Sequence, residues 1–147
     1  MKKPLVVRSA LVAALAATSI VVAGCSSDNT PTGGGGAPPP PALVATWNAT
    51  SLTAGGQDLT AMGVTLSFTF NNDNTYSFTA ANDPGNIFCD TGANCTDGGI
   101  YSATGSGITF DPGTVDEVSL GYTISGTTLT ATGTLDGNTV TFVFQKM

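Results

Sequence analysis

The alternation of apolar and polar side chains is the feature that most constrains the fold of this chain. From Ala42 to Met147, apolar residues recur at every second position in short runs that turn residues separate. A period of two predicts strands with one buried and one solvated face. The region shows no extended helical pattern, so we expect an all-β domain.

Seven runs show the alternation clearly, and residues 100–104 fit a weaker eighth strand. The positions between the apolar ones are mostly Thr and Ser, which suit a solvated strand face. The side chains predicted to face the interior are Leu43, Ala45, Trp47 and Ala49; Val64, Leu66, Phe68 and Phe70; Tyr76, Phe78 and Ala80; Ile108 and Phe110; Val118, Leu120, Tyr122 and Ile124; Leu129, Ala131 and Leu135; and Val140, Phe142 and Phe144.

The runs are separated by short turn sequences. These are Asn71–Asn74, Gly105–Gly107, Asp111–Gly113, Ser125–Gly126 and Asp136–Gly137. Connections of this length join neighbouring antiparallel strands, and Asp-Gly is a strong hairpin signal. Eight such strands remove their exposed edges by closing, so we expect an eight-stranded antiparallel up-and-down barrel. Its interior is either filled by side chains or holds one small ligand.

The N-terminal segment has the organisation of an export signal. A basic region with Lys2, Lys3 and Arg8 precedes an apolar run from Ala10 to Ala23. This run is short for a transmembrane helix, which needs about 20 residues, and no stop-transfer charges follow it. We therefore expect residues 1–24 to be a cleaved signal peptide.

Residues 22–25, Val-Ala-Gly-Cys, resemble the lipobox of bacterial lipoproteins, in which small residues precede an invariant cysteine. The resemblance implies that Cys25 carries a thioether-linked diacylglycerol and that its new amino group is open to acylation. The membrane is then a partner through this lipid. Ser26 is not the Asp of the family's inner-membrane retention signal, so the resemblance implies a lipid-anchored envelope protein, in the outer membrane where the host has two. The alternative is a plain secretory signal with a chance cysteine.

A tether separates Cys25 from the β-domain. Gly33–Gly36 predict a flexible joint, and Pro38–Pro41 favour an extended polyproline II spacer. The expected organisation is therefore a signal peptide at 1–24, a lipidated cysteine with its tether at 25–41, and a β-barrel domain at 42–147.

Charge narrows the classes of partner. Of the four basic residues, only Lys146 lies beyond the signal. All ten carboxylates lie beyond it. Such a surface repels phosphate backbones, so we expect no nucleic acid partner. It also disfavours attraction to anionic headgroups, so membrane association depends on covalent lipid.

The β-domain resembles bacterial lipocalin-like lipoproteins. The resemblance rests on Leu43–Trp47, on the Phe-rich strand, Asn/Asp turn and aromatic strand of Leu66–Ser77, and on Ile124–Lys146 with its final Val-Thr-Phe-Val-Phe-x-Lys sequence. It implies a lipocalin-like barrel that binds a ligand. Ala45 stands where true lipocalins have Gly.

Five aromatic residues are candidates for contact with a small apolar ligand, because all are predicted to point into the barrel. They are Trp47, Tyr76, Phe78, Tyr122 and Phe142. The alternative is that they pack against one another and fill the interior.

Cys89 and Cys95 remain once Cys25 is lipidated, and an even remainder in an oxidising compartment predicts a disulfide. The bond is expected to staple the long connection Asn82–Gly99, with about 2 kcal/mol of stabilisation on the chain-entropy model. A redox role needs the closer Cys-x-x-Cys spacing.

The same connection is rich in hard oxygen donors: Asp83, Asp90, Asp97, Asn82, Asn86 and Asn94. Their spacing does not match the calcium loop of an EF-hand. We therefore prefer a solvated loop and predict neither a metal nor another cofactor.

The chain offers little for catalysis. It has no His, and its basic residue beyond the signal is Lys146. Asp116 and Glu117 are neighbours on a predicted strand edge, where adjacent side chains point to opposite faces. We therefore expect a protein that is not an enzyme.

The sequence predicts a membrane-anchored envelope lipoprotein whose lipocalin-like module binds a small apolar ligand. Two alternatives remain open. One is a protein-binding or inhibitor module that acts through its loops, with the stapled Asn82–Gly99 segment as the presenting surface. The other is a structural surface lipoprotein with a solid barrel.

Overall fold

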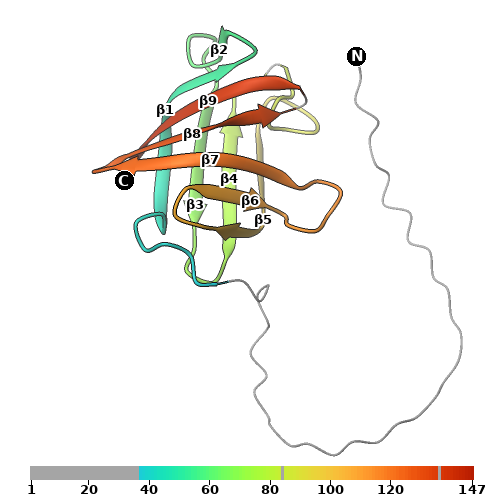
Figure 1. Cartoon of the computed structure of the whole chain (residues 1–147). Helices are drawn as coiled ribbons and strands as arrows, with labels where there is room; N and C mark the ends of the chain where they lie inside the picture. Colours follow the sequence, from blue (N-terminus) through green and yellow to red (C-terminus); the bar gives the residue numbers. More distant parts are fainter. Residues whose placement is uncertain (1–36, 84, 136) are drawn as a thin grey trace, which may run out of the picture. The chain divides into compact units, whose positions relative to one another are not determined.

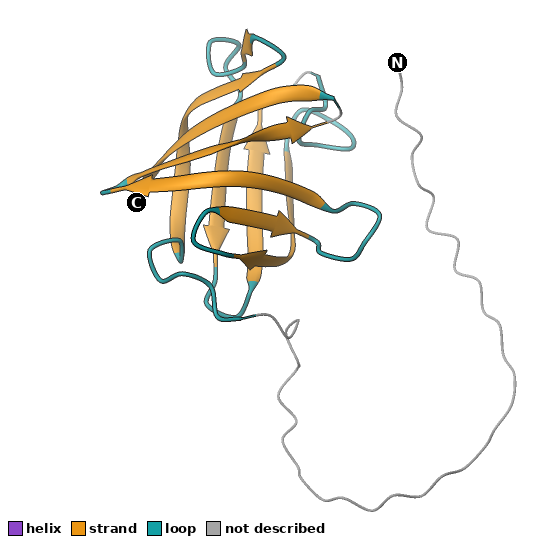
Figure 2. Cartoon of the chain, in the orientation of Figure 1, coloured by secondary structure: helices purple, strands orange, loops and turns teal. Residues whose placement is uncertain are grey.

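The structure, a computed structural model, describes residues 37–83, 85–135 and 137–147. The predicted signal peptide, Cys25 and most of the tether lie outside these residues. Within the described part of the chain every regular element is a strand, as Figure 2 shows. No helix in that part is long and apolar enough to cross a bilayer.

The strands form one antiparallel sheet that closes on itself. Going round the sheet the order is β2, β1, β3, β4, β5, β6, β7, β8, β9, and β1 also pairs with β9. The bounds are β1 Ala45–Ala54, β2 Gln57–Asp58, β3 Thr65–Phe70, β4 Thr75–Ala81, β5 Cys95–Ala103, β6 Gly107–Phe110, β7 Val118–Ser125, β8 Thr128–Leu135 and β9 Asn138–Lys146. The prediction of an eight-stranded up-and-down barrel is confirmed, with the two-residue β2 added at the edge of β1.

The barrel is formed by two walls that cross. In Figure 1, β1, β3 and β4 run steeply along one side, and β7, β8 and β9 pass across them on the other. Such steep crossing is the orthogonal packing of strongly twisted sheets. Side chains from both walls meet between them, and the buried set includes Leu66, Phe70, Leu129 and Phe144.

One end of the barrel is closed by the segment that leads into β1. The alternation predicted that Leu43 belongs to the first strand, but Leu43 lies in a turn. It is nevertheless fully buried. Its carbonyl accepts a hydrogen bond from Trp47 Nε1 at 2.8 Å. The Asn74 amide, in the β3–β4 turn, donates to the Ala37 carbonyl at 3.4 Å. The described chain, which begins at Ala37, therefore enters the domain at this closed end.

A bulge extends β1 beyond the predicted strand. Pairing with β9 shifts register between Ala49 and Ser51, and β1 continues to Ala54. The extra residue reverses the alternation, so Leu52 points inward and is fully buried. The predicted strand ended at Thr50 because a uniform period of two cannot accommodate this reversal.

The connection between β2 and β3 fills a gap in the wall. β1 pairs with β3 only over Ala45–Asn48. Beyond that stretch Leu59 donates from its backbone to the Leu52 carbonyl at 2.8 Å, and Val64 donates to the Leu59 carbonyl at 3.1 Å. Both side chains are buried, so this segment seals the barrel between β1 and β3.

β5 begins earlier than the alternation predicted. It starts at Cys95, so the connection after β4 ends at Asn94 and the predicted extent to Gly99 was wrong. β5 pairs with β4 from Cys95 to Ile100, but with β6 only from Tyr101 to Ala103. The first half of β5 escaped the sequence analysis because Asp97, Gly98 and Gly99 give no apolar period.

Candidate functional site

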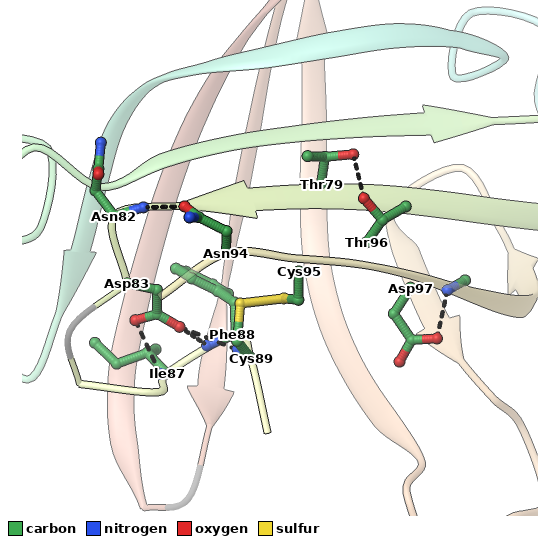
Figure 3. The surroundings of a disulfide bond; sticks show 11 residues. Thr79, Asn82, Asp83, Ile87, Phe88, Cys89, Asn94, Cys95, Thr96 and Asp97 are labelled. Carbon is green, nitrogen blue, oxygen red and sulfur yellow. Dashed lines mark hydrogen bonds between the residues drawn. A yellow bond between two sulfur atoms is a disulfide. The ribbon is translucent and has the colours of Figure 1, made fainter. Parts of the chain in front are cut away.

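The connection between β4 and β5, residues 82–94, is the most elaborately bonded loop among the described residues. The predicted disulfide is present: Cys89 and Cys95 are joined, with their Cα atoms 5.6 Å apart. Cys89 is buried and Cys95 opens β5, so the bond ties the loop to a strand. Figure 3 shows this bond between the two segments. We call residues 82–94 the stapled loop.

Asp83 organises the stapled loop from within. Its side chain is fully buried, and its carboxylate accepts hydrogen bonds from the backbone N–H groups of Ile87 at 3.0 Å, Phe88 at 2.7 Å and Cys89 at 3.0 Å. Successive N–H donors that converge on an anion compensate its desolvation. Both carboxylate oxygens therefore serve the loop's own backbone (Figure 3).

Further contacts fix the stapled loop to the barrel. The Asn82 backbone N–H donates to Asn94 Oδ1 at 3.1 Å, and the Asn82 side-chain amide donates to the Gly63 carbonyl at 3.2 Å. Phe88 packs edge-on against Phe142 of β9, with ring centroids 5.8 Å apart. The loop is thus held on the β2–β3 connection and on the interior wall.

The barrel interior contains a small apolar cavity. Its volume is about 40 Å³ and its lining consists only of apolar side chains, namely Phe68, Phe70, Ile108, Phe110, Leu120, Leu129, Ala131, Phe142 and Phe144. Sites for small organic ligands usually measure about 300–1,000 Å³. In this conformation the interior is therefore close to filled.

The five candidate ligand residues do not gather around this cavity. Phe142 lines it. Trp47 is buried at the closed end, and the Tyr122 hydroxyl donates to the Thr104 carbonyl at 2.6 Å. Tyr76 and Phe78 are half-buried in β4. Their joint role in ligand binding stays a prediction.

Tyr76 belongs to a cluster of a different kind, beside the first half of β5. Its hydroxyl donates to Asp111 Oδ2 at 2.7 Å, and Asp111 Oδ1 accepts from the Ile100 backbone at 3.2 Å. Burial raises the pKa of Tyr76, and the hydrogen bond to Asp111 raises it further, with the negative charges of Asp111, Asp97 and Asp116. Three carboxylates therefore act on one phenol at this point of the wall.

Gly99 makes the Tyr76–Asp111 contact possible. A Cβ atom at this position would clash with Asp111 Oδ1 and lie 3.1 Å from Tyr76 Cε1. Asp111 itself has a φ of 46°, in the left-handed region that few residues other than Gly, Asn and Asp adopt. The carboxylate is thus held against the strand by a turn that only a short polar side chain accommodates.

The structure corrects the placement of the acidic pair considered for catalysis. Asp116 and Glu117 lie in the loop between β6 and β7, not on a strand edge, because β7 begins at Val118. Glu117 Oε2 accepts from the Gly113 backbone at 2.7 Å. Lys146 Nζ lies 5.8 Å from the centroid of the Trp47 ring, as a cation–π contact.

No group of three or more His, Cys, Asp or Glu side chains in the described residues is placed to hold a metal ion. The predicted oxygen donors are dispersed, and several bind backbone groups. Asp97 Oδ1 accepts from Gly98 at 2.8 Å, for example. The structural role of Asp83 was not predicted. Its position ahead of Pro84 and Gly85 indicates a turn, but no neighbouring residue indicates its burial.

No protein-family model, curated protein or solved structure matches this chain.

Proposed function

We propose that this chain is a lipid-anchored envelope lipoprotein whose β-barrel is a protein-binding module, with the stapled loop as its presenting surface. The lipobox-like residues 22–25 and the Gly/Pro tether support the anchor. The negative charge and near absence of basic residues beyond the signal support a partner other than nucleic acid.

The observation that carries this proposal is the dense bonding of the described residues of the stapled loop. A buried carboxylate, a disulfide and two contacts of Asn82 hold them against the barrel and against one another. A loop that is already ordered loses little conformational entropy on binding. Such construction is more than a connection between two neighbouring strands needs, and Ile87 stays 37% exposed on it.

The stapled loop also lies at the end of the barrel opposite Ala37, where the described chain enters the domain. The Asn74 turn contacts Ala37 at the closed end, and β4 runs from that turn to Ala81. A strand of this length spans about 20 Å. The length of β4 therefore separates the stapled loop from the point where the described chain enters the barrel.

The small cavity favours a surface mode over an interior one. A volume of about 40 Å³ holds about one methyl-sized group. The apolar lining, which includes Phe142, keeps a small apolar ligand as the second candidate. Native mass spectrometry of the purified chain separates the two, since a co-purifying apolar molecule would favour the second.

A photocrosslinking amino acid in place of Ile87 tests the proposal in the host's membranes. We expect a discrete adduct from position 87 and none from position 147. Met147 is 79% exposed, and its backbone N–H donates to the Thr46 carbonyl near the start of β1, away from the stapled loop. The adduct should disappear when Cys89 and Cys95 are both replaced by Ser. An adduct that survives this change, or that forms equally from both positions, contradicts the proposal.

The anchor has a separate test. Mass spectrometry of the protein extracted from membranes should show an acylated N-terminal peptide beginning at Cys25. The Cys25→Ala variant should appear in the soluble fraction. Wild-type protein with an unmodified Cys25 contradicts the lipoprotein assignment and leaves the loop proposal standing.

A further inference from the structure

The wall of the barrel is incomplete beside the first half of β5. β6 pairs only with Tyr101–Ala103, so within the described residues no strand lies against Cys95–Gly99 on the side away from β4. We call this stretch the open edge. Strand edges with unpaired backbone groups are templates for pairing with another chain.

The direction of the backbone groups on the open edge follows from one hydrogen bond. The Tyr101 N–H donates to the Asn74 carbonyl, toward β4, at 2.7 Å. Because direction alternates along a strand, the N–H groups of Thr96, Gly98 and Ile100 point away from β4. Ile100 is satisfied by Asp111, and its carbonyl accepts from the Asp111 backbone at 2.8 Å. Thr96 and Gly98 face outward from the sheet edge.

The carboxylate of Asp97 lies at the open edge. It stands opposite Phe78 in the register of β4 and β5, so its side chain is on the interior side of the sheet. It is nevertheless exposed, and its carboxylate bends back to the Gly98 N–H at 2.8 Å (Figure 3). An inward-pointing charge on an edge strand is a common device against indiscriminate pairing. A partner must therefore displace this carboxylate, and a cation can do so favourably.

Aromatic side chains line the gap next to the open edge. Phe78 and Phe68 are only half-buried, with ring centroids 5.3 Å apart. Tyr76 and Phe110 meet edge-on at 4.9 Å. Interior-facing aromatics in the middle of strands stay partly exposed here because no strand covers them. The stem of a Lys or Arg side chain packs well on such rings while its charged head reaches a carboxylate.

We infer that the open edge accepts an extended segment of a partner protein that carries Lys or Arg at alternate positions. Its backbone would pair with Thr96 and Gly98, and its basic side chains would lie over Phe78 toward Asp97, Asp111 and Asp116. This is recognition by strand addition, in which backbone bonds provide affinity and alternate side chains provide specificity. The open edge adjoins the stapled loop, because Cys95 is bonded to Cys89, but its outward N–H groups belong to Thr96 and Gly98, which are not part of that loop.

The test uses the full chain, labelled with ¹⁵N and purified in detergent, and a ten-residue peptide of alternating Lys and Thr. We expect the peptide to slow amide exchange at Thr96 and Gly98 at least about tenfold. A peptide of alternating Glu and Thr should have no effect. Binding of the Lys peptide without slowed exchange, or no binding, overturns the inference. If exchange at Thr96 is slow without peptide and slows further as the protein concentration is raised, a second copy of the chain occupies the edge, and this result also overturns the inference.

Charge reversal provides a matched pair of variants. Asp97→Lys should weaken peptide binding by at least about tenfold, because it places a like charge at the centre of the edge. Asp58→Lys makes the same change in net charge on β2, which β1, β3 and β4 separate from β5, and should leave binding within about twofold. Equal weakening by both would reduce the effect to long-range attraction and contradict the inference.

Two more variants distinguish the open edge from the stapled loop as the surface that binds the peptide. Thr96→Pro removes an outward N–H while leaving the β4 ladder intact, so it should abolish binding. Ile87→Asp alters the stapled loop and should leave peptide binding unchanged. Loss of peptide binding in Ile87→Asp would place the peptide on the loop and overturn the inference. If the photocrosslinking residue at position 87 gives no adduct in the host's membranes while the purified protein still binds the Lys peptide, only the proposed function is overturned.

Discussion

Two parts of the same barrel wall differ sharply in how completely they are paired. β8 and β9 pair over eight positions, from Thr128 with Gln145 to Leu135 with Asn138. β5 and β6 pair over three. The β8–β9 wall keeps an apolar side chain at almost every interior position, whereas Asp97, Gly98 and Gly99 interrupt β5. The uninterrupted alternation lies in the fully paired wall, and the charge with two glycines lies in the stretch of β5 that β6 leaves uncovered.

The largest test of this contrast compares two phenylalanines. Phe142→Ala on β9 removes a side chain that is 4% exposed, and it should lower the free energy of unfolding by about 3–5 kcal/mol. Phe78→Ala, beside the open edge, should lower the free energy of unfolding by less than half as much, because the Phe78 side chain is only half-buried. Urea denaturation measures both. Equal costs would mean that the wall beside β5 packs as tightly as the β8–β9 wall.

The disulfide should contribute next. Replacing both Cys89 and Cys95 with Ser should lower the free energy of unfolding by about 2 kcal/mol, the chain-entropy value for a short ring. The effect should be local, so hydrogen exchange should rise in residues 82–99 and stay unchanged in β8 and β9. Faster exchange throughout the barrel would show that the disulfide supports the whole fold.

A pair of glycines sharpens the contrast within the well-paired wall. A Cβ atom on Gly133 of β8 would lie 2.5 Å from Leu120 Cδ2, whereas on Gly121 of β7 the nearest atom would be 3.7 Å away. Gly133→Ala should therefore cost about 1–3 kcal/mol through overpacking. Gly121→Ala should be close to neutral. Thermal unfolding of the two variants checks the difference, and equal melting temperatures would contradict tight packing at Leu120.

The last test concerns two tyrosines, Tyr76 and Tyr101, at alkaline pH. The pKa of Tyr76 is raised above its ordinary 10.0, chiefly by burial and then by its bond to Asp111, and burial raises the pKa of Tyr101 to about 12. The folded protein thus holds these protons more tightly than the unfolded chain does. Their stabilising effect is fully present below pH 10.0 and is lost as the pH rises through the folded-state values.

Unfolding measured between pH 9 and pH 12, with ultraviolet titration of the phenols, checks this expectation. Tyr76→Phe should show a shallower loss of stability over this range than the wild type. Asp111→Asn should lower the titration midpoint of Tyr76. A midpoint that does not move would show that the Asp111 contact has little influence on the phenol.

The fold could be predicted from the sequence where the local pattern and the global fold agree. The strands around Leu66–Phe70 and Val140–Phe144 alternate without interruption, and the structure places them as predicted. The disulfide was predictable because Cys89 and Cys95 are the pair left over after Cys25. In these regions the strand preference of each residue agrees with the strand that the global fold requires there.

The failures occur where contacts distant in sequence decide the structure. The bulge after Ala49 follows from the pairing of β1 with β9, which Thr50 and Ser51 do not announce. The early start of β5 follows from its ladder with β4, because backbone bonds extend a strand even where Asp97 and Gly98 lack the alternating pattern. The burial of Asp83 depends on three backbone donors that only the folded loop brings together.

The pairing of β1 with β9 has a kinetic consequence. The Thr50 hydroxyl bonds to the carbonyl of Val143, which lies 93 positions further along the chain, and the same two strands complete the barrel. Closing so long a loop is entropically costly, and folds dominated by such distant pairings form slowly. A sheet in which β1 and β9 have not yet paired has two free margins, which are these same two strands. Any factor that shields those margins during this interval would raise the yield of folded protein without altering its final stability.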